Sequence, residues 1–96
     1  MKTISRTELE RNLNGYSAHV ELWSPDEGDS FLMLNCRELL GEHIDELTAD
    51  QKKRLASVDK QVLTLANAKY EDETPDVGFL KLTADVIGGR VHRQAA

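Results

Sequence analysis

The amino-acid sequence predicts an α+β fold, in which a β-hairpin or small antiparallel sheet packs against three or four helices. Apolar residues recur every three or four positions over residues 48–70, which is the period of a helix with one buried face. They alternate with other residues over 16–23, which is the period of a half-buried strand. A further, almost wholly apolar segment follows Thr74 and Pro75.

The span 48–70 is the longest predicted helix, and the other elements are expected to pack around it. Thr48 is a suitable N-cap, and Gln51 at the third helical position can return a hydrogen bond to it, which makes a capping box. The inward stripe is formed by Leu55, Val58, Val62 and Leu65. A second apolar stripe lies beside it. The buried face is therefore wider than a coiled-coil seam, which favours a core helix over a dimer zipper.

A short helix over residues 6–14 is predicted before the hairpin. Ser5 and Glu8 form a second capping box at its start. Gly15 follows Asn14, and glycine tolerates the left-handed conformation that commonly ends helices. We therefore expect the helix to stop at Asn14 and a strand to begin directly after it.

The hairpin is predicted from two apolar segments that flank a run of turn residues. Residues 16–23 form its first strand, an acidic turn covers 24–29, and residues 30–35 form its second strand. Two strands alone are marginally stable in water. A third strand, for which residues 2–5 are the candidate, or a covering helix is therefore needed.

Two further helices complete the predicted fold. One covers residues 36–46, with Asn35 as its N-cap. The other begins after Thr74 and ends before Gly88. A strand over residues 77–83 is the alternative for this last segment.

The last predicted helix is apolar on two adjoining stripes, so few of its positions are left to face water. Such a helix must be buried inside the fold or against another subunit. The residues expected to form an interaction face are Val77, Phe79, Leu80 and Val86. We therefore expect a complex with another protein or a homodimer of two-fold symmetry.

The composition bounds the class of protein. A chain of 96 residues, 40% of them hydrophobic, suits one domain, predicted over 1–90 with 91–96 as a flexible C-terminal tail. The net charge of −5 makes nucleic acid an unlikely partner, because phosphate contacts need an excess of Lys and Arg. The single cysteine, Cys36, fits a reducing cytoplasm. No apolar run has the length of a membrane helix, so no membrane association is expected.

Three side chains that could carry chemistry are His19, His43 and Cys36. Cys36 and His43 lie seven positions apart on one predicted helix, a separation that does not suit a zinc pair or a catalytic dyad. His19 and Glu21 share one face of the first predicted strand, where surface residues of a hairpin commonly lie. We therefore expect no enzyme, no cofactor and no metal. A small enzyme that uses His19, His43 or Cys36 is the least favoured alternative.

Another pattern is formed by Met1, Thr3, Ile4, Ser5, Glu8, Asn12 and Leu13, together with the segment 28–35. These residues resemble the opening of Phd/YefM-type antitoxins, in which a short strand, a helix, a hairpin and a second helix follow one another. The resemblance implies a dimeric DNA-binding regulator, with Arg6 and Arg11 near the operator and a C-terminal segment that masks a toxin. The early end of the first helix at Gly15 and the acidic charge depart from that family.

The leading functional prediction is a small acidic, non-enzymatic module that binds another protein, as inhibitors, immunity proteins and regulatory proteins do. It rests on the lack of a catalytic pattern, on the acidic composition and on the apolar C-terminal helix. The alternative is the antitoxin-like DNA-binding regulator. The sequence leaves the identity of the partner open.

Overall fold

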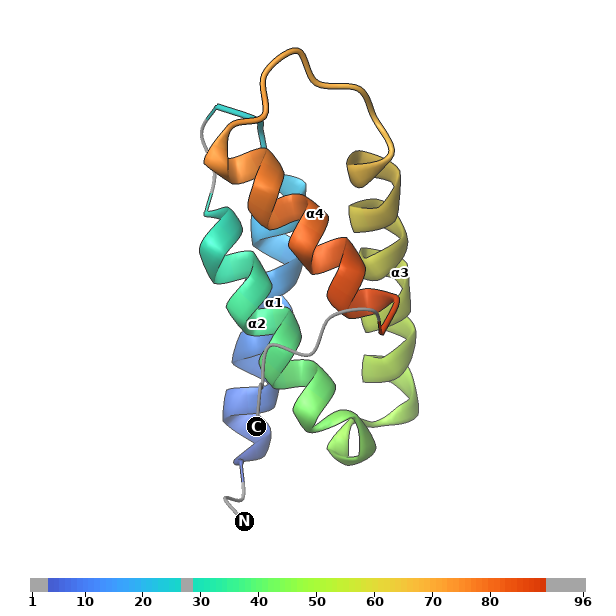
Figure 1. Cartoon of the computed structure of the whole chain (residues 1–96). Helices are drawn as coiled ribbons and strands as arrows, with labels where there is room; N and C mark the ends of the chain where they lie inside the picture. Colours follow the sequence, from blue (N-terminus) through green and yellow to red (C-terminus); the bar gives the residue numbers. More distant parts are fainter. Residues whose placement is uncertain (1–3, 27–28, 90–96) are drawn as a thin grey trace.

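Four α-helices and one short 3-10 helix form the described part of the chain, which in this computed structural model comprises residues 4–26 and 29–89 (Figure 1). The elements are α1 (Arg6–Glu21), α2 (Ser30–Glu42), η1 (Ile44–Glu46), α3 (Ala49–Ala66) and α4 (Pro75–Ile87). Within the described residues there is no strand, so the predicted α+β class is wrong and the fold is all-helical. The predicted tail over 91–96 lies outside the described residues.

The four α-helices run alternately up and down in Figure 1, so that α1 is parallel to α3 and α2 is parallel to α4. Helix α1 packs against α2 and α3, and α4 packs against the same two helices. Helices α2 and α3 therefore face each other diagonally across the bundle, although they follow one another in the chain. The core between the helices includes Leu9, Leu13, Tyr16, Val20, Met33, Leu40, Leu55, Val58, Val62, Leu80 and Ala84.

Helix α1 replaces both the short first helix and the first strand of the predicted hairpin. Leu9, Leu13, Tyr16 and Val20 are all buried, and their spacings of four, three and four place them on one helical stripe. Leu22, which the alternation assigned to the inner face of a strand, is 79% exposed. The strand predicted over 16–23 is wrong because the buried residues Tyr16 and Val20 fit a period of two as well as the helical period of 3.6.

Gly15 does not end the first helix, and it lies where α1 contacts α2. It lies inside α1, and its φ is not positive, since Gly89 is the glycine with a positive φ among the described residues. A Cβ added at Gly15 would lie 3.6 Å from the Cys36 Sγ on α2. The glycine thus marks a helix–helix contact, which a local reading of the sequence takes for a stop signal.

Helix α2 covers the segment that was predicted as the second strand. It begins at Ser30, so the predicted start at Asn35 and Cys36 is wrong. Ser30 is buried, and its Oγ accepts a hydrogen bond of 2.6 Å from the Trp23 indole. Of the candidate third strand at 2–5, only Ile4 and Ser5 are described, and Ser5 caps α1.

The two helices of the C-terminal half begin where the sequence predicts. The Thr48 hydroxyl accepts from the Gln51 backbone at 3.1 Å, and the Gln51 side chain accepts from the Thr48 backbone at 2.9 Å, which confirms the capping box of α3. Helix α3 ends at Ala66, four residues earlier than predicted. Thr74 caps α4, and the alternative of a strand over 77–83 is wrong.

A polar cluster joins three helices near the middle of the bundle. Asp59 on α3 accepts from the Tyr16 hydroxyl on α1 at 2.6 Å. The Arg37 guanidinium on α2 donates to both oxygens of the same carboxylate, at 2.9 and 3.1 Å. The side chains of Arg37 and Asp59 are only 11% and 14% exposed. This bidentate pair links the two diagonal helices, α2 and α3.

The place of Gly15 inside α1 predicts that Gly15→Ala stabilises the protein. Alanine has the higher helix propensity, and its Cβ would meet the Cys36 sulfur at an ordinary contact distance. We expect the free energy of unfolding in urea to rise by about 0.5–1 kcal/mol. Gly78→Ala in α4, where a Cβ meets nothing within 4 Å, is the matched control and should have the same effect. A loss of stability for Gly15→Ala would indicate the left-handed stop that the sequence suggested.

The buried phenol of Tyr16 predicts a defined pH dependence. Burial and the neighbouring Asp59 carboxylate raise the pKa of Tyr16 well above the ordinary tyrosine value of 10.0. The stability that this difference contributes is complete below about pH 10 and falls as the pH rises above that value toward the raised pKa of the folded state. Tyr16→Phe lacks this titration and also loses the hydrogen bond to Asp59.

We therefore expect Tyr16→Phe to be less stable than the parent protein by about 1–3 kcal/mol at neutral pH, because the lost hydrogen bond has a charged acceptor. This gap should narrow above about pH 10. Urea unfolding of both proteins across that range measures it. A gap that stays constant with pH would contradict the burial of the phenol.

Candidate functional site

The described surface carries a group of apolar side chains on the outer faces of α2 and α4. Phe31 is 50% exposed, Leu32 is 48% exposed and Leu82 is 36% exposed. Three half-buried residues extend the same faces. We call the whole set the α2–α4 surface, and its members are Phe31, Leu32, Leu39, Phe79, Leu82 and Val86.

The two halves of the α2–α4 surface are joined by an aromatic contact. Phe79, Leu82 and Val86 follow at spacings of three and four, so they form one stripe along α4. The rings of Phe31 and Phe79 meet edge to face, with their centroids 5.5 Å apart. Helices α2 and α4 pack side by side and run in the same direction. The Phe31–Phe79 contact therefore joins the exposed apolar residues of α2 to the stripe on α4.

The structure divides the interaction face that the sequence predicted. Val77 and Leu80 are completely buried in the core of the same chain. Phe79 and Val86, on the adjoining stripe of α4, are partly exposed and belong to the α2–α4 surface. Only the outer of the two predicted stripes is therefore open to a partner.

Phe31 and Leu32 are members that the sequence analysis missed, because it placed them in a strand. A signal was present in the four consecutive apolar residues from Phe31 to Leu34. Four consecutive side chains of a helix span more than its inner face. Met33 and Leu34 are buried, and the other two point outward.

The cations of α2 and α4 are engaged within the chain. These two helices contain one arginine and one lysine, Arg37 and Lys81. Arg37 is bound to Asp59, and the Lys81 ammonium is bound to Glu73. The hydrogen bond from Lys81 lowers the pKa of Glu73, which keeps that carboxylate charged.

One end of the bundle is acidic. We call residues 22–26 and 67–74 the loop end, because these two connections lie together at the top of Figure 1. The rings of Trp23 and Tyr70 meet at 5.5 Å, and the Thr74 hydroxyl donates to the Pro25 carbonyl. The described carboxylates here and at the adjoining helix starts are Asp26, Asp29, Glu71, Asp72, Glu73 and Asp76, against Lys69 and Lys81.

The residues proposed for a small enzyme do not gather into one site. His19 faces Asp29 at 3.6 Å, while His43 contacts Glu46. Cys36 is half-buried against Gly15, and burial raises the pKa of its thiol, which disfavours the reactive thiolate. Among residues 4–26 and 29–89, no group of three His, Cys, Asp or Glu side chains is placed to hold a metal ion.

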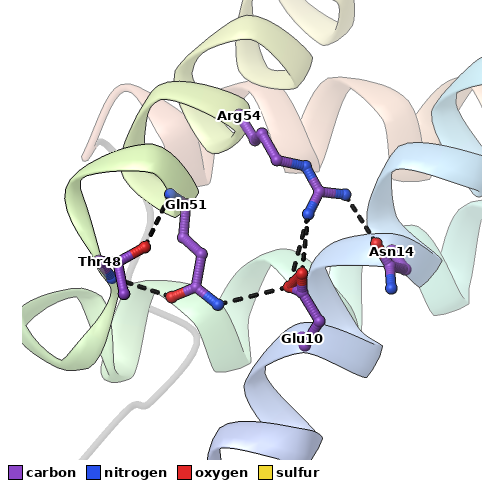
Figure 2. A network of polar contacts seen from close by, with 5 residues as sticks. All are labelled: Glu10, Asn14, Thr48, Gln51 and Arg54. Carbon is purple, nitrogen blue, oxygen red and sulfur yellow. Dashed lines mark hydrogen bonds and ion pairs between the residues drawn. The ribbon is translucent and has the colours of Figure 1, made fainter.

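Arg6 and Arg11, the candidate DNA contacts, lie exposed on α1 beside a network that joins α1 to α3. Together with Glu10 and Asn14 they line an open hollow of about 510 Å³. Figure 2 shows that the Arg54 guanidinium of α3 donates to Glu10 at 3.0 Å and to Asn14 at 2.7 Å. Glu10 and Asn14 thus serve to hold α3, so the surface around Arg6 and Arg11 is not uniformly basic.

Comparisons of the chain with family models, with curated proteins and with solved structures found no match. The resemblance to Phd/YefM-type antitoxins therefore stays a prediction, while the hairpin expected over 16–35 is wrong. None of the described helices combines the length and the apolar character needed to cross a membrane.

Proposed function

We propose that this chain is a non-enzymatic interaction module that binds another protein through the α2–α4 surface. The single observation that supports the proposal is the exposure of Phe31, Leu32 and Leu82 on two helices that the Phe31–Phe79 contact joins. Large contiguous apolar patches are uncommon on soluble monomers and frequently mark binding sites. Aromatic side chains are also enriched among the residues that dominate binding energy.

The exposed apolar side chains of this surface supply part of the free energy that binding a partner needs. Complete burial of a Leu or Phe side chain is worth about 1.5–3 kcal/mol. Phe31 and Leu32 are each about half exposed, and Leu82 is about one-third exposed. Covering these side chains therefore adds a few kcal/mol that the isolated chain does not gain.

The proposed class is that of inhibitors, immunity proteins and regulatory proteins, which act by occupying a surface of their partner. Such a role needs no reaction centre, and it agrees with the separate locations of His19, His43 and Cys36. We place this activity in the cytoplasm, because a single thiol suits a reducing compartment.

Site-specific photo-crosslinking tests the proposal. A photoreactive amino acid placed at position 32 or position 82 should give a covalent adduct with the same partner protein in cells of the native host. Both positions are exposed, so the fold should tolerate the change, and thermal unfolding checks this.

Position 57 is the matched control, because Ser57 is exposed on α3 and lines the groove between α1 and α3. An adduct from 32 and 82 but not from 57, identified by mass spectrometry as one protein, is the expected result. The proposal fails if no adduct forms, or if all three positions give the same mixture.

A further inference from the structure

We infer that the segment that occupies the α2–α4 surface is an amphipathic helix with an apolar stripe and with Lys or Arg side chains near the loop end. This inference rests on the proposed function, since it names the chemistry of the partner at the same surface. It is carried by the position of the aromatic pair next to the acidic loop end.

Phe31 and Phe79 lie near the starts of α2 and α4, where both helices leave the loop end (Figure 1). Among the described residues, the loop end and the adjoining helix starts carry six carboxylates, against Lys69 and Lys81. Each helix N-terminus adds only about half of a positive charge, which leaves the end strongly acidic. A partner that covers the two rings therefore brings its flanking residues into a negative potential, which favours Lys and Arg.

A helix is the partner conformation that this surface suits. The described residues contain no strand, so they offer no sheet edge to which an extended peptide could add. Two parallel helices packed side by side instead present ridges of side chains to a third helix. A partner helix with apolar residues at i, i+3, i+4 and i+7 matches the spacing of Phe79, Leu82 and Val86.

A second copy of this chain suits the surface less well. The cations of α2 and α4, Arg37 and Lys81, are already bound to Asp59 and Glu73. The same two helices also carry the carboxylates of Glu42 and Asp76. A symmetric dimer would bring two copies of this acidic surface together, and like charges across an interface are unfavourable.

Two synthetic amphipathic helical peptides with the same Leu stripe test the inference, one with Lys and one with Glu at the flanking positions. Titration of each peptide into the isotopically labelled protein, followed by NMR, measures affinity and location together. We expect the Lys peptide to shift the amides around Phe31, Leu32, Phe79 and Leu82. It should bind at least about tenfold more tightly than the Glu peptide at low salt, and added salt should reduce this ratio.

Matched variants separate the contributions of the charges and of the apolar side chains. Glu71→Gln with Asp72→Asn removes two exposed carboxylates from the loop end and should weaken the Lys peptide several-fold. Asp45→Asn with Asp50→Asn removes two exposed carboxylates far from the loop end and should leave its affinity unchanged. Leu82→Gln should weaken both peptides.

Each other outcome is decisive. Equal affinity of both peptides at the α2–α4 surface would overturn the inference about charge and leave the proposed function standing. The inference would also be overturned if Leu82→Gln did not weaken the Lys peptide, or if neither peptide bound the protein. In both cases the crosslinks from positions 32 and 82 decide the proposed function independently. A dimer in sedimentation experiments that Leu82→Gln dissociates would show that a second copy of the chain occupies this surface, which would overturn the inference.

Discussion

The Asp59 carboxylate is the group that fixes the arrangement of the helices. It accepts hydrogen bonds from Tyr16 on α1 and from Arg37 on α2 while it is itself part of α3. Removing charges from water is costly, and the bidentate geometry with the added phenol offsets that cost. Because α2 and α3 lie diagonally in the bundle, this ion pair connects two helices that are not adjacent in it.

The same interaction determines which side of α2 faces water. Arg37 points inward to reach Asp59, so positions about half a turn away along the helix point outward. Leu32 and Leu39 are such positions, and Phe31 lies at the edge next to α4. The part of the proposed binding surface that α2 contributes therefore lies on the side of the helix away from the polar cluster.

Local signals in the sequence predicted the starts of α1, α3 and α4 but wrongly placed the start of α2 at Asn35, and signals that depend on tertiary contacts were misread. The caps at Ser5, Thr48 and Thr74 are present as expected, because a cap involves only residues close in sequence. Gly15 was taken for a helix stop, yet it lies inside α1 at the contact with Cys36 of α2. Whether a glycine ends a helix or lies inside one depends on packing that the local sequence does not contain.

The candidate site was predictable in part for a similar reason. The sequence indicated that α4 has two apolar stripes, and Phe79 and Val86 do lie on the outer one. It could not tell which stripe faces the core, because that depends on how α4 is rotated against α2 and α3. The sequence analysis missed Asp59 altogether. A polar residue beside an apolar stripe is assigned to the solvent-exposed face of a helix until its partners are known.

A double-mutant cycle between Arg37 and Asp59 tests the central claim most directly. We expect Arg37→Met and Asp59→Asn each to lower the free energy of unfolding by about 3 kcal/mol, because each leaves a buried charge or polar group without its partner. The double variant should lose much less than the sum, with a coupling of about 2 kcal/mol or more. Strictly additive losses would show that the ion pair does not hold α2 to α3 and would contradict this account.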